Sequence, residues 1–334
     1  MIAAVQLKKY FPVVSGIRSL FSKSKGRYVK AIDNVSFKIA RGEVLGLVGE
    51  SGCGKTTTGR VVVGLESPTA GDVFIDDQSC RQVKKQNRKQ FYRMVQMIFQ
   101  DPYGSINPQH NVTQILARPL RYQGIGRQRS VYEKVCETLE LVELSPASDY
   151  LDKYPHQLSG GQRQRLCIGR AIILEPEFLV ADEPISMLDV SIKSGILALL
   201  KNLIQQKNLS LLYITHDLAT VGYICQVIAI MYLGRIVEIG TTADVLDHPL
   251  HPYTQALISA IPIPDPDLKR ATINISGAVP DPINLPPGCR FSPRCSRAVA
   301  TCTAAEPTLI GAGAGGSHQV ACYRPLAATR ESGL

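Results

Sequence analysis

The strongest constraint on the fold is the octapeptide at residues 49–56, which reads Gly-Glu-Ser-Gly-Cys-Gly-Lys-Thr and matches the pattern G-x-x-x-x-G-K-[S/T]. The apolar run at 43–48 predicts a buried strand before it, and residues 57–65 can continue as a helix after it. A loop between such a strand and helix points backbone N–H groups at phosphate oxygens, and the helix N-terminus adds positive potential. The sequence therefore predicts a phosphate site on a parallel α/β fold rather than a chance glycine-rich turn.

The positions of this loop have distinct expected roles. Lys55 would reach the β- and γ-phosphates of a nucleotide, and Thr56 would offer its hydroxyl to Mg²⁺. Glycine allows the backbone to turn and to approach the phosphates closely. The predicted nucleotide-binding residues of this segment are Gly49, Glu50, Ser51, Gly52, Cys53, Gly54, Lys55, Thr56 and Thr57.

Two adjacent acids follow a second apolar run. Residues 178–181 are Phe-Leu-Val-Ala, a pattern typical of a buried parallel strand, and Asp182 and Glu183 stand at its end. Asp182 would hold Mg²⁺ through water, and Glu183 would polarise the attacking water. Phosphoryl transfer depends mainly on positioning and charge neutralisation, which these groups can supply. The alternative, that the two acids only cap a helix, carries little weight beside the phosphate loop.

Two more motifs are compatible with phosphate chemistry, although each has a purely structural alternative. In the sequence Leu-Ser-Gly-Gly-Gln at 158–162, Ser159 supplies a hydroxyl, Gly160 and Gly161 allow close backbone approach, and the helix expected to begin near Gln162 would attract anions. A plain helix cap is the alternative. Residues 211–215 predict a third buried strand that ends before His216, and a lone histidine there is usually structural.

The order of the phosphate loop, Gln100, the 158–162 motif, Asp182-Glu183 and His216 resembles that of the ATP-binding subunits of ABC transporters. The resemblance implies an α/β P-loop NTPase cassette with a RecA-like core, an antiparallel β part and an inserted α-helical subdomain. It identifies Gln100 as the Q-loop residue, which is also expected at Mg²⁺, and His216 as a contact of the γ-phosphate.

The same resemblance assigns residues 186–189 to the D-loop, with Asp189 near nucleotide and Met187 where alanine is usual. In this family the 158–162 motif closes over ATP held by a partner. The functional unit is then a head-to-tail dimer with two composite ATP sites. An aromatic ring before residue 31 should stack on adenine, and Phe11 fits best, with Tyr10 and Tyr28 as rivals.

The C-terminal part narrows the resemblance to the ATPases of dipeptide and oligopeptide importers, F-type subunit. The resemblance to these importers is carried by the motifs at 251–262, 287–295 and 318–322 with Cys302, and the F-type assignment by those at 8–12 and 99–105. The implied organisation is a nucleotide-binding domain over 1–255, with the helical subdomain inserted at about 101–168, and a C-terminal extension over 256–334. Helical periodicity at 131, 135, 139 and 142 supports the insertion.

This narrower resemblance also implies a set of partners. They are a second, related ATPase subunit in a heterodimer, two membrane-spanning permease subunits and an extracytoplasmic peptide-binding protein. The protein would lie peripherally on the cytoplasmic face of the inner membrane, because the chain has no run of the roughly 18 apolar residues that a spanning helix needs and opens without a secretory segment. Nickel, glutathione or oligosaccharides are alternative cargoes, and a soluble ABC ATPase without a transport role is a further alternative.

Four of the nine cysteines fall within 34 residues near the C-terminus. The intervals between Cys289, Cys295, Cys302 and Cys322 contain 5, 6 and 19 residues, so the C-x-x-C pairs of zinc ribbons are missing. Four thiolates suit either a 4Fe-4S cluster or structural zinc, and His318 could replace one of them around zinc. The resemblance to importer ATPases with this type of C-terminal region favours the cluster.

The net charge of +9 invites a nucleic-acid interpretation, which we reject. Its best local support is the run 81–93, with six Lys or Arg and no acid. Such a run is usually a solvated helix or loop face, and no groove-reading or base-stacking motif accompanies it.

Overall fold

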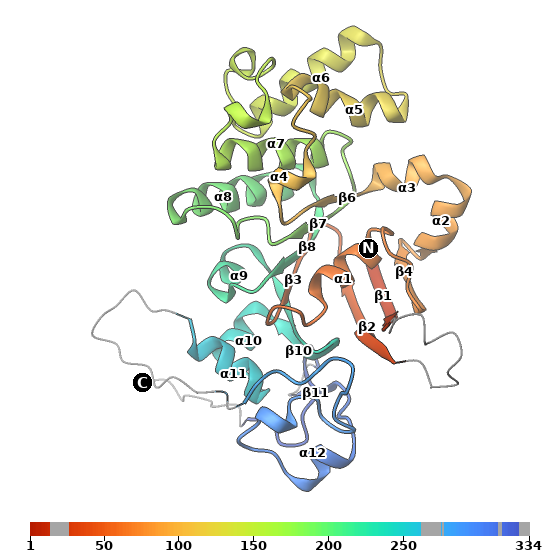
Figure 1. Ribbon diagram of the computed structural model, residues 1–334, viewed down its shortest axis with the longest axis vertical. Coiled ribbons are helices and arrows are strands. Elements are labelled where there is room, and N and C mark those ends of the chain that lie inside the picture. Colours follow the sequence, from red (N-terminus) through yellow and green to blue (C-terminus); the bar gives the residue numbers. More distant parts are fainter. Residues whose placement is uncertain (14–26, 262–274, 276, 313–315, 327–334) are drawn as a thin grey trace. The chain divides into compact units, whose positions relative to one another are not determined.

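The computed structural model of the chain describes residues 1–13, 27–261, 275, 277–312 and 316–326. These residues form two compact units. Unit 1 comprises Met1–Ala3, Lys38–Val44 and Phe74–Ile214, and unit 2 comprises Ala4–Phe37, Leu45–Val73 and Thr215–Leu334. Figure 1 follows the elements of both along the chain.

Helices and strands alternate along most of the chain. The strands are β1 (Ile2–Pro12), β2 (Tyr28–Ile39), β3 (Val44–Val48), β4 (Ala70–Ile75), β5 (Gln78–Ser79), β6 (Val95–Ile98), β7 (Phe178–Asp182), β8 (Ser210–Thr215), β9 (Val227–Tyr232), β10 (Arg235–Thr241), β11 (Ile310–Ala312) and β12 (His318–Val320). The α-helices are α1 (Lys55–Val62), α2 (Cys80–Gln86), α3 (Arg88–Met94), α4 (Pro102–Ser105), α5 (Val112–Gln123), α6 (Gln128–Leu141), α7 (Gly160–Ile172), α8 (Val190–Lys207), α9 (Leu218–Ile224), α10 (Thr242–Asp247), α11 (Pro252–Ser259) and α12 (Ala300–Ala304). Short 3₁₀ turns are η2 (Ala147–Asp149), η3 (Pro155–Gln157) and η4 (Ser292–Arg294).

Unit 1 contains the parallel strands β6, β7 and β8. Val95 pairs with Phe178, and Phe178 pairs in turn with Ser210. Every residue of β7 and β8 is buried, which explains why the sequence there reads as an uninterrupted apolar run. The strand predicted at 178–181 is thus confirmed and extends to Asp182, so the carboxyl end of β7 carries Asp182 and Glu183.

The region predicted to be helical contains α5, α6 and α7 of unit 1. A reciprocal capping box between Asn111 and Gln114 starts α5, and Gly124, at a φ of 73°, ends it. The buried faces of α5 to α7 carry apolar residues at helical spacing, among them Leu116, Val135 and Leu139, all with no exposed surface. Helix α7 lies beside α8 in this unit (Figure 1).

In unit 2, β3 runs parallel to β9, with Leu45 opposite Val227. Strands β9 and β10 form an antiparallel hairpin that turns at Leu233-Gly234, and both turn residues have a positive φ. Strand β12 then pairs with β10, and β11 with β12. The sequence did not predict β11 and β12, because three residues are too few to show a period.

The basic run at 81–93 forms α2 and α3. Five of its six basic side chains are exposed and Lys84 is half-buried. The interpretation as a solvated helical face is therefore confirmed. Within the described ranges, no helix has both the length and the apolar composition of a membrane span.

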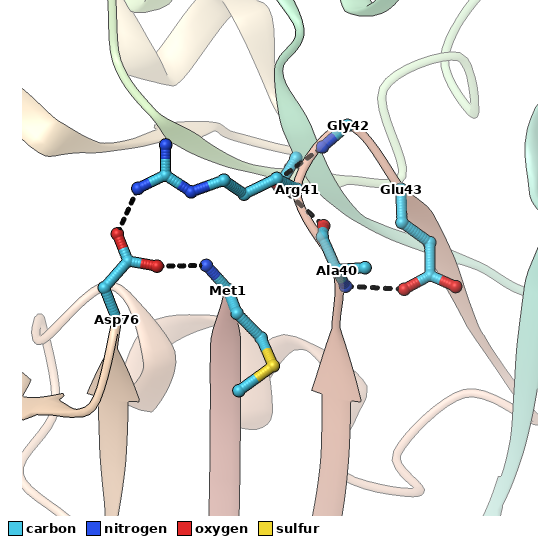
Figure 2. Close-up of polar contacts among 7 residues, drawn as sticks. Met1, Ala40, Arg41, Gly42, Glu43 and Asp76 are labelled. Atoms are coloured by element: carbon cyan, nitrogen blue, oxygen red, sulfur yellow. Dashed lines mark hydrogen bonds and ion pairs between the residues drawn. The ribbon is translucent and has the colours of Figure 1, made fainter.

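A polar cluster holds the turn that leads into β3. The backbone N–H of Ala40 donates to the Glu43 carboxylate at 2.6 Å. The carboxylate of Asp76 accepts from Arg41 and from the Met1 ammonium (Figure 2). These contacts fix the short connection before the strand that ends at the phosphate loop.

Candidate nucleotide site

Residues 49–54 form the loop between β3 and α1, and two of its glycines are required by close approach of other backbone. A Cβ on Gly49 would lie 2.1 Å from the Met231 carbonyl oxygen, and one on Gly54 would lie 2.0 Å from that of Ala31. Gly54 also has a φ of 108°, which L side chains rarely adopt. The predicted strand, loop and helix are present, with α1 beginning at Lys55 and ending at Val62 rather than at residue 65.

The Lys55 ammonium lies inside this loop. Its Nζ donates to the carbonyl oxygens of Gly49 at 2.6 Å and Glu50 at 2.9 Å, and the residue is 5% exposed. A buried ammonium that contacts only carbonyl dipoles is stabilised further by an anion. A phosphate oxygen would supply that negative charge for Lys55. Thr56 and Thr57 follow, half-buried, in the first turn of α1, while Ser51 and Gly52 are exposed.

The ends of β6 and β7 bring Gln100 and Glu183 together. Gln100 Nε2 donates to Glu183 Oε2 at 3.0 Å. Glu183 has a φ of 44°, and its N–H donates to the Ile214 carbonyl at 2.9 Å. The chain turns through 183–188, and the next helix, α8, begins at Val190. Glu183 is therefore not a helix cap, which removes the structural alternative for this residue.

Asp182 is the last residue of β7 and is 2% exposed. Its burial at the carboxyl end of a parallel strand is the placement expected of a metal-directed carboxylate in an α/β fold. The strand thus places one acid inside and the next, Glu183, half-buried at the turn.

The motif at 158–162 starts α7 through a capping box. Ser159 Oγ accepts from the Gln162 N–H at 3.3 Å, and Gln162 Oε1 accepts from the Ser159 N–H at 3.0 Å. The motif therefore does act as a helix cap, which was the structural alternative for it. Gly161 has a further packing role, since a Cβ there would lie 2.7 Å from Ile192 Cγ2 on α8, whereas one on Gly160 would come no closer than 3.7 Å to Leu188.

The D-loop residues expose apolar surface next to Asp189. Met187 is 58% exposed and Val190 is 83% exposed. Asp189 is the N-cap residue of α8, but its side chain makes no capping hydrogen bond. Two exposed apolar side chains thus lie close to Asp189 along the chain.

His216 lies in unit 2 directly after the end of β8 and is exposed, while its neighbour Asp217 has a structural role. The Asp217 carboxylate caps α9 by accepting from the Ala219 N–H at 3.0 Å. The Asp217 N–H donates to Thr215 Oγ1 at 2.9 Å. The acid after the histidine therefore fixes the start of α9.

The candidate adenine-stacking rings differ in how they are held. Burial, together with the hydrogen bond to Asp33 at 2.6 Å, raises the pKa of Tyr10 to about 12. Phe11 and Tyr28 have exposed rings, and Lys9 Nζ lies 4.9 Å from the Phe11 ring centre. The Tyr10 hydroxyl is thus held by Asp33, and the choice of Phe11 over Tyr10 and Tyr28 as the adenine-stacking ring stays a prediction.

The four C-terminal cysteines line one small cavity of unit 2, together with His251 and Phe291 among others. Burial raises the pKa of Cys289 to about 11 and also raises the pKa values of Cys295 and Cys322. Across the part of the chain that the structure describes, no group of three His, Cys, Asp or Glu side chains has the arrangement of a metal site. The thiol chemistry suits a metal, whereas the positions of the thiols do not form a closed ligand set.

His318 contacts Glu238, and it is not among the described residues that line the cysteine cavity. Its Nε2 lies 2.7 Å from Glu238 Oε1. Glu238 is fully buried and also accepts from the N–H groups of Leu250 at 2.8 Å and His251 at 2.9 Å. The structure therefore gives no support to His318 as a substitute zinc ligand.

Two residues that sequence reasoning did not single out contact the phosphate loop. Arg294 donates to both carboxylate oxygens of Glu50, at 2.8 and 3.2 Å. The Tyr253 hydroxyl accepts from the Glu50 N–H at 3.0 Å. Both residues lie in motifs noted at 251–262 and 287–295, but nothing in the local pattern indicated a contact with residue 50.

Comparisons with known proteins show the family to which the chain is similar. A family described as ABC transporter matches residues 32–186, and one described as oligopeptide/dipeptide transporter, C-terminal region, matches residues 237–302. The chain is 46% identical over 302 residues to a putative peptide import ATP-binding protein of Brucella ovis, covering 90% of this chain and 94% of the relative. It is 42% identical over 323 residues to the dipeptide transport ATP-binding protein DppF of Escherichia coli, covering 97% and 94%.

Solved structures support the fold. The dimeric ATP-binding cassette MJ0796 in a post-hydrolysis state, bound to ADP and Pi, superimposes with a TM-score of 0.63 at 24% identity, over 72% of this chain and 99% of that one. The predicted P-loop cassette fold is confirmed by this likeness. The domain boundaries at residues 255 and 256 are not tested by it and stay a prediction, and parts of 256–334 lie outside the described residues.

Proposed function

Since the chain belongs to the ABC transporter family, within the group of dipeptide and oligopeptide transport ATP-binding proteins that hydrolyse ATP to drive transport, we propose that it powers the import of short peptides. The observation that carries the proposal is the phosphate loop in which a buried Lys55 ammonium is held by two backbone carbonyls. Its position suits a lysine that binds the β- and γ-phosphates of ATP.

Each residue of the site has a proposed task in hydrolysis. The 49–57 loop and the N-terminus of α1 cradle the phosphates, and Lys55 neutralises their charge. Glu183 orients the attacking water, and its hydrogen bond from Gln100 at 3.0 Å holds the carboxylate in place. His216 contacts the γ-phosphate, and Phe11 stacks on adenine.

The proposed residues for Mg²⁺ are Thr56, Gln100 and, through water, Asp182. When bound, the ion neutralises charge on the phosphate oxygens. The donor chemistry fits, since oxygen ligands suit Mg²⁺ and Asp182 is an acid buried at a strand end.

The proposed working assembly contains further chains. Ser159, Gly160, Gly161 and Gln162 of this subunit would close over ATP bound to a related ATPase, and Asp189 would meet the same interface. The exposed Met187 and Val190 support such a contact. Two permease subunits and an extracytoplasmic peptide-binding protein would complete a transporter at the cytoplasmic face of the inner membrane, with residues 1–255 as the nucleotide-binding domain and 256–334 as the extension.

We propose that Cys289, Cys295, Cys302 and Cys322 hold a 4Fe-4S cluster, with zinc as the alternative. The supporting observation is that all four thiols line one cavity. Burial raises the pKa values of Cys289, Cys295 and Cys322, which favours protonated thiols, and a bound cation would favour thiolates instead. Such a centre would link the segments that carry these four cysteines and stabilise the extension rather than take part in ATP hydrolysis.

Two variants test the ATPase assignment. Glu183→Gln should bind ATP with near-normal affinity but lose turnover by at least ~100-fold, because the group that orients water is lost while the phosphate cradle stays. Lys55→Ala should instead lose ATP binding itself. Affinity for a fluorescent ATP analogue and phosphate release by the assembled transporter separate the two effects. Normal turnover by Glu183→Gln would contradict the proposed role of Glu183.

A further inference from the structure

The C-terminal region reaches the phosphate loop of its own chain at one residue, Glu50. The guanidinium of Arg294 donates to both Glu50 carboxylate oxygens, and the Tyr253 hydroxyl accepts from the Glu50 N–H. The Glu50 carbonyl in turn accepts from Lys55 Nζ at 2.9 Å. The side chain, the N–H and the carbonyl of Glu50 thus all form hydrogen bonds. The partners of the side chain and the N–H are Arg294 and Tyr253, which lie beyond residue 250.

The Arg294–Glu50 pair is well placed to hold the loop. The Arg294 side chain is 9% exposed and that of Glu50 is 26% exposed, so solvent screens the pair far less than a surface ion pair. A two-point contact between guanidinium and carboxylate fixes direction as well as distance. The face of Tyr232 lies 5.8 Å from the Arg294 guanidinium and limits its movement.

A cluster of aromatic rings packs around Phe291, three residues before Arg294. The Phe291 ring centre lies 5.4 Å from those of Tyr232 and Tyr253 and 5.7 Å from that of His251. Phe291 precedes η4, which contains Arg294. The arginine therefore projects from a rigid base and not from a loose loop.

A second arginine of the same segment, Arg290, acts on the phosphate loop indirectly, through the turn at Leu233-Gly234. Arg290 donates to the Leu233 carbonyl and to Asp33, and its Nε lies 2.9 Å from Glu306 Oε1. Next to Leu233, the Gly234 N–H donates to the carbonyl of Cys53 in the phosphate loop at 2.8 Å. The short segment 290–294 thus contacts Glu50 directly through Arg294 and holds, through Arg290, the turn whose Gly234 contacts Cys53.

We infer that Arg294 is a positioning residue for ATP binding: by holding Glu50 it sets the carbonyl that aligns Lys55, so that the C-terminal extension controls nucleotide affinity within its own chain. The inference rests on the proposed ATPase function. It assigns the extension a role at the nucleotide site in addition to any stabilising centre at the cysteines.

A double-mutant cycle tests the inference. Arg294→Gln and Glu50→Gln should each raise the Kd of the full-length subunit for MgATP by about 5-fold or more, and the double variant should show no further increase, because both changes break one interaction. For Arg294→Gln in the assembled transporter, KM for ATP should rise while kcat at saturating ATP is retained. Glu50→Gln lies far along the chain from the cysteines, so it separates the loop effect from any disturbance of Cys295.

Two further variants serve as controls. Arg129→Gln removes an exposed arginine that pairs with Glu133 on α6, and it should leave the Kd unchanged. The double variant Glu50→Arg with Arg294→Glu exchanges the two charges. Its affinity for MgATP should be higher than that of Glu50→Arg alone or Arg294→Glu alone.

The measured Kd values distinguish a failure of the inference about Arg294 from a failure of the proposed ATPase function. An unchanged Kd for both Arg294→Gln and Glu50→Gln, even with a lowered melting temperature, would overturn the inference, as would additive effects in the double variant. If Lys55→Ala lost ATP binding in the same assay, the proposed function would stand without the inference. If Lys55→Ala bound ATP normally, the proposed function itself would fail.

Discussion

Single residues of the phosphate loop and the C-terminal region are fixed by steric and polar contacts. Gly49 and Gly54 leave no space for a Cβ, so their identity follows from backbone packing. His251 is equally constrained, because its Nδ1 accepts from the Tyr253 N–H at 3.0 Å and caps α11. That cap orients the tyrosine whose hydroxyl contacts the phosphate loop, which gives the His-Pro-Tyr motif a physical purpose.

His251 makes stability depend on pH. Burial lowers the pKa of His251 from 6.5 to about 4, although Glu238 opposes this shift. Between these values the unfolded chain takes up a proton that the folded chain does not. The contribution of His251 to the free energy of unfolding should therefore be constant above pH 6.5 and fall as the pH drops from 6.5 to 4, by roughly 3 kcal/mol in all.

The variant His251→Asn isolates this contribution, because asparagine can still cap α11 but does not titrate. Denaturant unfolding of the wild type and the variant at several pH values should show a shallower fall for the variant. Parallel curves for the two proteins would contradict the assignment to His251.

At the scale of elements, the C-terminal extension is joined to the sheet of unit 2. Strand β12 pairs with β10 through Glu238 and Ile239, and the Ala321 N–H donates to the Val237 carbonyl at 2.8 Å. The cysteine cavity lies in the same extension. Few regular elements support it, so a metal centre would matter for its stability.

Replacement of a cysteine tests this centre. Cys295→Ser should abolish the brown visible absorption expected of an anaerobic wild-type preparation and lower the melting temperature, with a smaller effect on kcat than on stability. Iron, acid-labile sulfide and zinc analyses of the wild type are the measurement. A colourless wild-type protein that contains zinc would rule out the cluster, and one that contains neither metal would rule out both.

At the scale of the whole molecule, the chain divides into two compact units that each carry part of the predicted machinery. Unit 2 holds the phosphate loop, His216 and the C-terminal extension. Unit 1 holds Gln100, Asp182 and Glu183 together with the 158–162 motif. The proposed function requires residues of both units as well as those of a partner ATPase.

The partner contact can be tested at Ser159. Because Ser159 caps α7, Ser159→Ala should cost about 1 kcal/mol of stability without adding bulk. Ser159→Phe loses the same cap and adds a large ring where the partner's ATP is proposed to bind. In the complete transporter, with the matching change in the related ATPase, the phenylalanine variant should lose far more ATPase activity than the alanine variant. Equal activities would contradict the head-to-tail dimer.

Local patterns determined the elements that carry the chemistry. The uninterrupted apolar runs predicted β3 and β7, because a strand buried on both faces needs apolar residues throughout. The glycine pattern predicted the phosphate loop, and the helical period predicted the segment from α5 to α7. Such signals lie within a few residues of one another, so the sequence alone contains them.

Tertiary structure decided what the local pattern does not encode. Arg294 and Glu50 are 244 residues apart, and neither residue type predicts the other. Likewise, only the tertiary structure shows that the Tyr253 hydroxyl contacts the phosphate loop and that His318 contacts Glu238. It also shows that the four C-terminal cysteines line one cavity. The physical reason is that these contacts depend on how distant segments pack, whereas strands, helices and the phosphate loop follow from backbone sterics and the burial of neighbouring side chains.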